Sequence, residues 1–115
     1  MATMPADSVG GVPVVTPTGA LDLAGVRSLA SKLAELAGSP GDTVLDLSQV
    51  GFMDSVGLAV VLKAANRFRR QDKQLVVVVP PAGNIARLID VTGASAGVSV
   101  AGTRDEALSR AAPAP

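Results

Sequence analysis

The sequence predicts an α/β protein with a mixed, largely parallel sheet of about four to five strands and about four helices. Short apolar segments alternate with helical patterns from residue 44 onward, and breaks rich in glycine and proline separate them. The run at 75–79 is apolar without interruption. A strand without a polar side is typical of a sheet covered on both faces, so we expect helical crossovers between parallel strands.

The N-terminal part is expected to begin with a flexible lead-in, residues 1–10, followed by a strand at 12–18. Pro13 and Pro17 fall within that strand. Because proline has no backbone N–H to donate to a neighbouring strand, the two residues indicate an edge position or a distorted strand.

A turn is predicted at 19–22 and a helix from about 23 to 37. The helix is indicated by apolar residues that recur in steps of three and four. Glycine, serine and proline after residue 37 are expected to end it. The predicted apolar stripe consists of Val26, Leu29, Ala30, Leu33 and Leu36.

The remainder of the chain supplies the alternating part of the fold. Thr103 and Glu106 have the spacing of a capping box at the start of a terminal helix. The predicted elements are a strand at 44–48, a connection at 49–54, a helix at 55–71, a strand at 75–79, a short helix that closes at Gly93, a strand at 98–101, a helix at 103–111 and a frayed tail at 112–115.

Length and composition are those of one folded domain, which we place at residues 11–111. The chain has 115 residues, of which 48% are hydrophobic, and its ten basic and ten acidic residues cancel. This apolar content is sufficient for one core, so a disordered chain is excluded. A balanced charge gives no reason to expect direct binding of nucleic acid or of an anionic membrane.

Several residue types are absent, and their absence excludes whole classes of activity. Without Cys or His, the chain cannot form a thiol nucleophile, a disulfide or a Ser-His-Asp triad. Only Phe52 and Phe68 are aromatic, which argues against a base-stacking surface. We therefore expect a protein that is not an enzyme and has no cofactor of its own. The lack of a long apolar run and of a secretory signal favours the cytoplasm.

The best candidate for a functional site is the segment Asp54-Ser55 at the start of the helix predicted from residue 55. Free N–H groups and the helix dipole favour negative charge there, so a phosphoryl group on Ser55 is physically acceptable. Gly57 could allow close approach of a partner. The residues alone also fit a structural interpretation, in which Asp54 and Ser55 cap the helix and Gly57 permits packing on the sheet.

Two other patterns have weaker claims to a function. Asp46 and Asp54 could in principle hold Mg²⁺, although the direction of Asp46 in its strand is not known from the sequence. A basic cluster at the end of the second helix is better explained as a solvated surface than as a phosphate or nucleic-acid site. This cluster consists of Arg67, Arg69, Arg70 and Lys73.

Residues 44–48 (VLDLS) followed by 52–58 (FMDSVGL) resemble the central signature of STAS domains, and in particular of bacterial anti-sigma factor antagonists. In that family a hydrophobic-Asp-Leu strand precedes an Asp-Ser-Ser/Thr-Gly-Leu turn. Residues 19–22 (GALD) are similar to the family's Gly-Glu-Leu-Asp, and 91–93 (VTG) to its Leu-Thr-Gly. The resemblance spans residues 12–111 and implies a STAS-type fold.

The resemblance also implies a regulatory cycle. Such antagonists bind an anti-sigma factor that is also a serine kinase, are released when it phosphorylates them, and are restored by a PP2C-type phosphatase. By position, Ser55 would be the phosphorylated residue and Asp22 a contact for kinase recognition. The expected partner-binding residues are Asp22, Asp54, Ser55, Val56 and Gly57.

Three departures from the family pattern keep the partner open. Val56 replaces a hydroxyl residue, Ala20 replaces a glutamate, and residues 94–97 (ASAG) stand where leucine is frequent. A STAS subunit of another assembly, such as a lipid-transport ABC complex or a stressosome-like scaffold, is the alternative. A small nucleotide-binding protein or hydrolase that uses the helix start near Ser55 is a further one.

Overall fold

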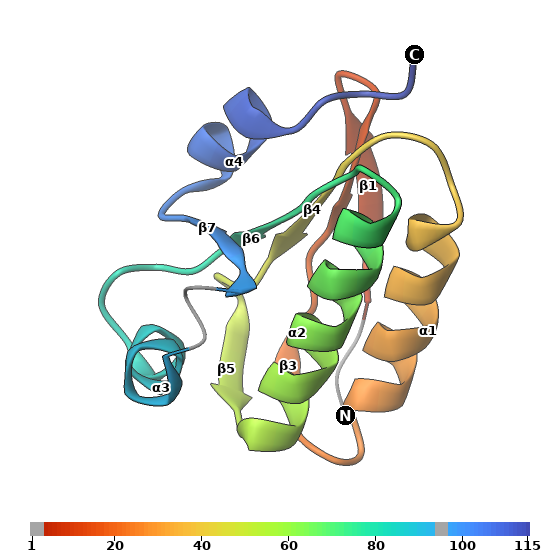
Figure 1. The fold of residues 1–115 in the computed structure, drawn as a ribbon. Helices are drawn as coiled ribbons and strands as arrows, with labels where there is room; N and C mark the ends of the chain where they lie inside the picture. Colours follow the sequence, from red (N-terminus) through yellow and green to blue (C-terminus); the bar gives the residue numbers. More distant parts are fainter. Residues whose placement is uncertain (1–3, 94–96) are drawn as a thin grey trace.

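The computed structural model describes residues 4–93 and 97–115, and these form a sheet with helices on both faces (Figure 1). The strands are β1 (Ala6–Val9), β2 (Val12–Val15), β3 (Gly19–Leu21), β4 (Thr43–Asp46), β5 (Val50–Met53), β6 (Leu75–Val78) and β7 (Ser99–Ala101). The helices are α1 (Val26–Ala37), α2 (Ser55–Arg70), α3 (Asn84–Thr92) and α4 (Arg104–Arg110). None of the described helices is long and apolar enough to cross a lipid bilayer.

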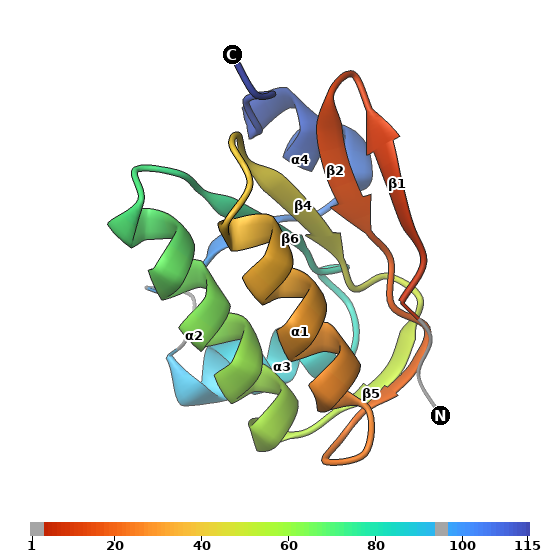
Figure 2. The ribbon, with the colours of Figure 1, turned by 90° about the vertical axis from the view of Figure 1, so that its right-hand side faces the viewer.

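The main sheet has five strands in the order β1-β2-β4-β6-β7, and β3 pairs with β5 in a small second sheet. Among the described strands, β1 and β2 pair antiparallel and the other pairs are parallel. Helices α1 and α2 lie side by side over one face, and α4 lies on the opposite face (Figure 2). The predicted mixed, largely parallel α/β fold is therefore confirmed.

Both faces of the central strands are buried, which explains their continuous apolar sequences. In β6, Val77 points into the core shared with α1, α2 and α3, whereas Val76 and Val78 point into a smaller core under α4. Alternating side chains of one strand thus serve two cores. The largest buried side chain is Phe68 of α2, which has no exposed surface.

The expectation of a loose lead-in was wrong for residues 6–9, which form β1. This strand pairs with β2 from Ala6 opposite Val15 to Val9 opposite Val12. Gly10 and Gly11 connect the two strands with φ values of 58° and 83°. Two successive positive φ angles suit a tight hairpin turn and favour glycine at both positions.

The hairpin also changes the place of β2. The two prolines predicted an edge or distorted strand, yet β2 lies between β1 and β4. Pro13 is opposite Ser8 of β1, while Val14 and Val15 are in register with β4. The register with β4 covers only Val14 and Val15, so Pro13 lies outside this parallel pairing, and the exposed four-residue strand β1 is the actual edge.

Two further segments expected as a turn and a connection form the small β3–β5 sheet. Residues 19–21 are β3 and residues 50–53 are β5, with Leu21 in register with Met53. Each strand is too short to show a periodic pattern, and each has its hydrogen-bonding partner about thirty residues away. This pairing was therefore not visible in the local sequence.

The first residue of the predicted frayed tail at 112–115 is attached to the domain. The backbone N–H of Ala112 donates to Asp42 Oδ2 at 2.8 Å, and the Asp42 N–H donates to the carbonyl of Ala112 at 2.9 Å. Asp42 also accepts from the backbone and side chain of Gln74. The buried carboxylate thus links the tail to the start of β6.

The predicted capping box of α4 is only partly formed. The hydroxyl of Thr103 accepts from the N–H of Glu106, but the Glu106 side chain accepts from the N–H of Gly102.

An ion pair between a buried aspartate and a partly exposed arginine links α4 to the sheet. Asp46, at the end of β4, is 3% exposed and lies 3.0 Å from the guanidinium of Arg104. Arg104 also donates to the hydroxyl of Thr16. Burial by itself would raise the pKa of the Asp46 carboxyl, but hydrogen bonds with Ser48 and Arg104 and the charge of Arg104 bring it below its usual value.

We expect Asp46→Asn to lower the free energy of unfolding by about 1–3 kcal/mol at pH 7. Because the folded-state pKa is depressed, this stabilisation is complete above the unfolded-state pKa, about 3.9, and is lost as the pH falls through the lower folded-state value. Urea unfolding between pH 7 and pH 2 measures the effect. The difference in the free energy of unfolding between Asp46→Asn and the parent protein should become smaller as the pH falls. A difference that stays constant with pH would contradict the role assigned to the Asp46 carboxylate. The exposed Asp105→Asn on α4 is the control.

Candidate functional site

The carboxyl ends of β3 and β5 bring the predicted site residues together. Leu21 and Met53 are in register, and each is followed by an aspartate, Asp22 or Asp54, and then by a helix. Parallel strands with this register place their following residues at the same edge of the sheet. Figure 1 shows the end of β5 and the start of α2 at this edge.

Asp54 caps α2. Its Oδ1 accepts hydrogen bonds from the backbone N–H groups of Val56 and Gly57, both at 3.0 Å. Two of the N–H groups at the helix start that could hold a phosphate therefore already donate to the carboxylate of Asp54. The structural interpretation of Asp54 is correct, and the arrangement leaves less room for a phosphate cradle than the sequence suggested.

Asp22 shapes the turn before α1, whereas the N-cap of α1 is Gly25, which has no side-chain cap. Its Oδ1 accepts from the N–H groups of Ala24 at 3.1 Å and Gly25 at 3.2 Å. Asp22 is half-buried, so its carboxylate shapes the turn and remains partly accessible to solvent.

Ser55 is the first residue of α2 and is exposed. Within the described part of the chain its hydroxyl has no hydrogen-bonding partner. A hydroxyl at a helix start that neither caps nor packs is free to react with an enzyme that reaches it. Ser55 is thus a predicted site residue with a polar side chain that the described part of the fold does not use.

Gly57 is buried, and its missing side chain is explained by packing inside the chain. A β-carbon built at this position would lie 2.4 Å from the carbonyl oxygen of Leu21 and 2.8 Å from Cγ of Met53. The close approach is therefore that of α2 to the end of β3. This favours the structural interpretation of Gly57 over its prediction as a partner contact.

Exposed apolar side chains around Ser55 were not among the predicted site residues, apart from Val56. Phe52 is 49% exposed, Val56 39% and Leu23 75%. Phe52 lies on β5, and Leu23 follows Asp22 in the turn after β3. Sequence reasoning missed Phe52 because β5 was expected to be a connection, which left the direction of its side chains undefined. Exposed aromatic and aliphatic side chains on segments that meet at one edge of the fold are typical of a protein-binding surface.

The other candidate patterns are dispersed by the fold. Asp46 is paired with Arg104 and Asp54 caps α2, so the two carboxylates have separate roles. In the basic cluster, Arg69 donates to the carbonyl of Gly97, and Lys73 donates to the carbonyl of Ala37 at the end of α1. The departure at 94–97 lies outside the described residues, except for Gly97.

Comparisons with known proteins agree with this geometry. The family described as "Mlab, STAS domain" matches residues 4–102. The solved structure of an anti-sigma factor antagonist from Mycobacterium paratuberculosis is 30% identical, with a TM-score of 0.83, over 95% of this chain and 92% of that one. No curated protein matches the sequence.

Two solved structures of SpoIIAA share the fold at lower identity. Unphosphorylated SpoIIAA, an anti-sigma factor antagonist, is 19% identical with a TM-score of 0.71, over 94% of this chain and 96% of that one. The phosphorylated form of SpoIIAA, a Bacillus cell fate determinant, is 20% identical with a TM-score of 0.67, over 94% of this chain and 98% of that one. The family match and the 30% identical structure place this chain in the STAS domain family, among the anti-sigma factor antagonists.

Proposed function

We propose that this protein binds an anti-sigma factor that is also a serine kinase, and that phosphorylation of Ser55 ends the binding. The observation that carries the proposal is the free hydroxyl of Ser55 within an exposed apolar surface at the start of α2. Similarity to anti-sigma factor antagonists, one of them solved in a phosphorylated form, supports it.

In this proposal the catalytic groups belong to the partner. The kinase supplies ATP and Mg²⁺, the Oγ of Ser55 forms a bond to the γ-phosphorus, and ADP leaves while the hydroxyl proton passes to a base of the kinase. A PP2C-type phosphatase hydrolyses the phosphate ester and restores the serine. The chain itself contributes an accessible hydroxyl on a rigid helix start, held by the Asp54 cap.

The surroundings of Ser55 explain why a phosphate would disrupt binding. A phosphoryl group adds about −1.5 to −2 charge, and its neighbours are the apolar Phe52 and Val56 and the acidic Asp54. The N–H groups of Val56 and Gly57 already donate to Asp54. A partner that covers the apolar surface would therefore bury a charge without new hydrogen bonds, which is unfavourable.

The direct test is incubation with kinase-type anti-sigma factors and ATP, followed by mapping of the modified residue. We expect one phosphate on the parent protein, at Ser55, and none on Ser55→Ala. Ser31→Ala, which removes an exposed hydroxyl from α1, is the matched control and should be phosphorylated like the parent. Neither a complex nor modification of Ser55 with any such kinase would refute the proposal.

A STAS subunit of another assembly is the second candidate. It is favoured by Ala20, which pairs with Phe52 in the β3–β5 sheet, so that an aromatic ring beside alanine lies where the family pattern has a glutamate. Val56 adds a second apolar difference next to Ser55. Co-purification with a membrane permease or its ATPase, unaffected by Ser55→Asp, would support this candidate over the first.

A further inference from the structure

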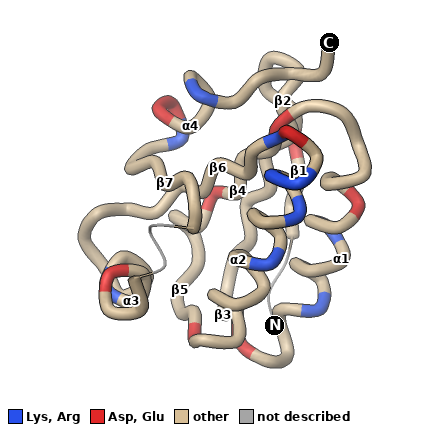
Figure 3. The backbone as a smooth tube through the Cα atoms, in the orientation of Figure 1, with Lys and Arg blue, Asp and Glu red and all other residues tan. Residues whose placement is uncertain are grey.

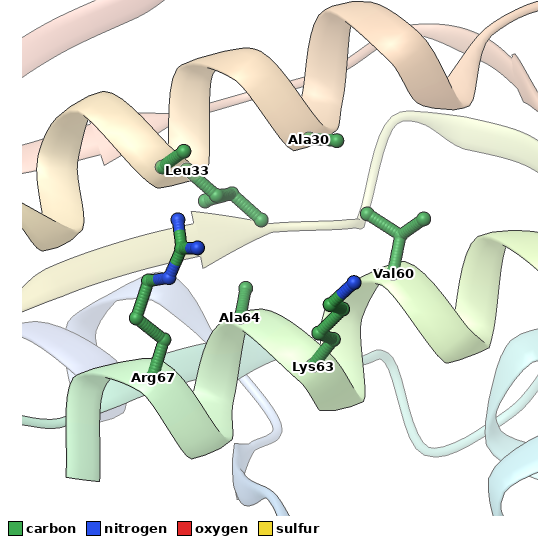
Figure 4. Close-up of a pocket in the computed structure, with 7 residues that line it drawn as sticks. Ala30, Leu33, Val60, Lys63, Ala64 and Arg67 are labelled. Carbon is green, nitrogen blue, oxygen red and sulfur yellow. The ribbon is translucent and has the colours of Figure 1, made fainter. Parts of the chain in front are cut away.

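A groove of about 280 Å³ lies between α1 and α2, on the face away from the sheet (Figure 4). It extends over two turns of α2, from Val60 to Arg67, which is roughly 10 Å along the helix axis. Three of its lining residues are alanine, so the side chains at these positions are small. The lining residues are Ala30, Leu33, Ala34, Val60, Lys63, Ala64 and Arg67.

The charges at this groove are all positive. Lys63 and Arg67 rise from α2 on either side of Ala64 and extend toward α1 (Figure 4). Neither has a carboxylate within 4.0 Å in the described part of the chain, where the ion pairs involve other residues. Helix α2 has no acidic residue, and the one acid of α1, Glu35, is paired with Lys32 at 3.6 Å.

The separation of charge is notable in a chain with a net charge of zero. Figure 3 shows basic residues along α2 and acidic residues mainly elsewhere on the backbone. An apolar floor with two unneutralised cations on one wall is complementary to a ligand that has an apolar body and one negative group.

We propose that this groove binds a medium-chain aliphatic carboxylate, with its chain along the floor and its carboxylate on Arg67 and Lys63. Small-molecule sites are largely apolar with a few polar groups that orient the ligand, and this groove has that composition. A guanidinium can hold a carboxylate through two parallel hydrogen bonds, with the ammonium as a second charge. With its carboxylate at Arg67, the last lining residue of α2, an extended chain of about eight carbon atoms would reach Val60 over the roughly 10 Å length and pass Lys63 on the way.

The groove is separate from the surface proposed for the anti-sigma factor. It begins at Val60, more than one turn beyond Ser55, and shares no residue with the exposed apolar surface of Phe52, Val56 and Leu23. The two proposals therefore stand or fall independently.

The test is a titration of the full chain with sodium octanoate, followed by NMR of backbone amides and methyl groups. We expect saturable shifts confined to the groove methyls, such as those of Leu33, Val60 and Ala64, with an apparent Kd of about 1 mM or below for a ligand of this size. Octyltrimethylammonium, which has a similar tail and the opposite charge, should bind at least about tenfold more weakly.

Three variants separate the charge from the shape of the groove. Lys63→Gln with Arg67→Gln should weaken octanoate binding about tenfold or more. Arg70→Gln with Arg87→Gln makes the same change in net charge at exposed positions outside the groove and should bind like the parent. Ala30→Phe fills the groove and should abolish binding with both cations in place, while thermal unfolding checks that each variant is folded.

Three results would overturn the proposal. These are shifts that do not saturate, equal binding of octanoate and octyltrimethylammonium, and equal loss of affinity in the two charge variants. Phosphatidylglycerol vesicles form a separate arm of the experiment. Sedimentation with these vesicles without binding of free octanoate would assign the basic face to an anionic membrane surface instead.

Discussion

Replacing Gly57 with alanine is expected to lower the free energy of unfolding by about 2–3 kcal/mol, although alanine is the better helix former by about 1 kcal/mol. The added β-carbon would lie 2.4 Å from the carbonyl oxygen of Leu21. That oxygen belongs to the backbone of β3, so the contact can be relieved only by moving the start of α2 away from the sheet.

Gly51→Ala is the matched control for this substitution. Gly51 is exposed on β5, and the nearest atom to an added methyl group would be the carbonyl oxygen of Gly19 at 4.0 Å. We expect Gly51→Ala to change stability by less than about 0.5 kcal/mol. Urea unfolding followed by circular dichroism measures both variants. Equal midpoints for the two would show that the start of α2 is free to move.

The Gly57 substitution also has a consequence for the proposed function. Ser55 lies two residues earlier on the same helical turn, and the Asp54 carboxylate accepts from the N–H of Gly57 itself. A shift of the start of α2 therefore displaces Ser55 and also weakens the Asp54 cap of the helix. We expect slower phosphorylation of Gly57→Ala by a cognate kinase under conditions where the variant is folded.

The second large effect is expected in partner binding. Ser55→Asp should weaken binding of the anti-sigma factor by about tenfold or more, whereas Ser55→Ala should retain the parent affinity. The aspartate would place a charge among Phe52, Val56 and Asp54, where a bound partner excludes water. Isothermal titration calorimetry with the purified partner measures both variants.

Salt and a distant charge test the physical cause of that loss. If Ser55→Asp weakens binding because it buries a charge at the interface, about 0.5 M salt will leave most of the loss of affinity in place. The reason is that only exposed charges are strongly screened by salt. Ser31→Asp adds the same charge on the exposed side of α1 and should bind like the parent. Equal affinities of Ser55→Asp and Ser55→Ala would contradict the proposed switch.

Much of the fold could be predicted because the central strands and the helices have strong local patterns. Strand β6 has a continuous apolar sequence, and both α2 and α4 begin at residues that favour caps. Each of these signals lies within a few neighbouring residues, so it can be recognised without knowledge of the tertiary structure. The helix ending at Gly93, with a φ of 72°, belongs to the same class.

The errors concern short elements, most of them with partners that are distant in the chain; β1 is the exception, because it pairs with β2 across the Gly10-Gly11 turn. Strands β1, β3 and β5 have three or four residues each, and their stability comes from pairing. Ala112, at the start of the tail, is held by Asp42, seventy residues earlier. No local pattern encodes such distant contacts, and this explains why a turn was expected at β3 and a connection at β5. The β1–β2 hairpin, by contrast, had a local sign in the Gly10-Gly11 pair.

The sequence alone determined that Ser55 stands at a helix start in a STAS signature, because helix caps and that signature are contiguous in the chain. Only the tertiary structure decided what surrounds it. The β3–β5 register brings Asp22, Asp54 and the exposed Phe52 to one edge, and it places the backbone of Leu21 against Gly57. Exposure, close packing and the direction of a side chain depend on segments far apart in the chain, and those are defined only when the chain is folded.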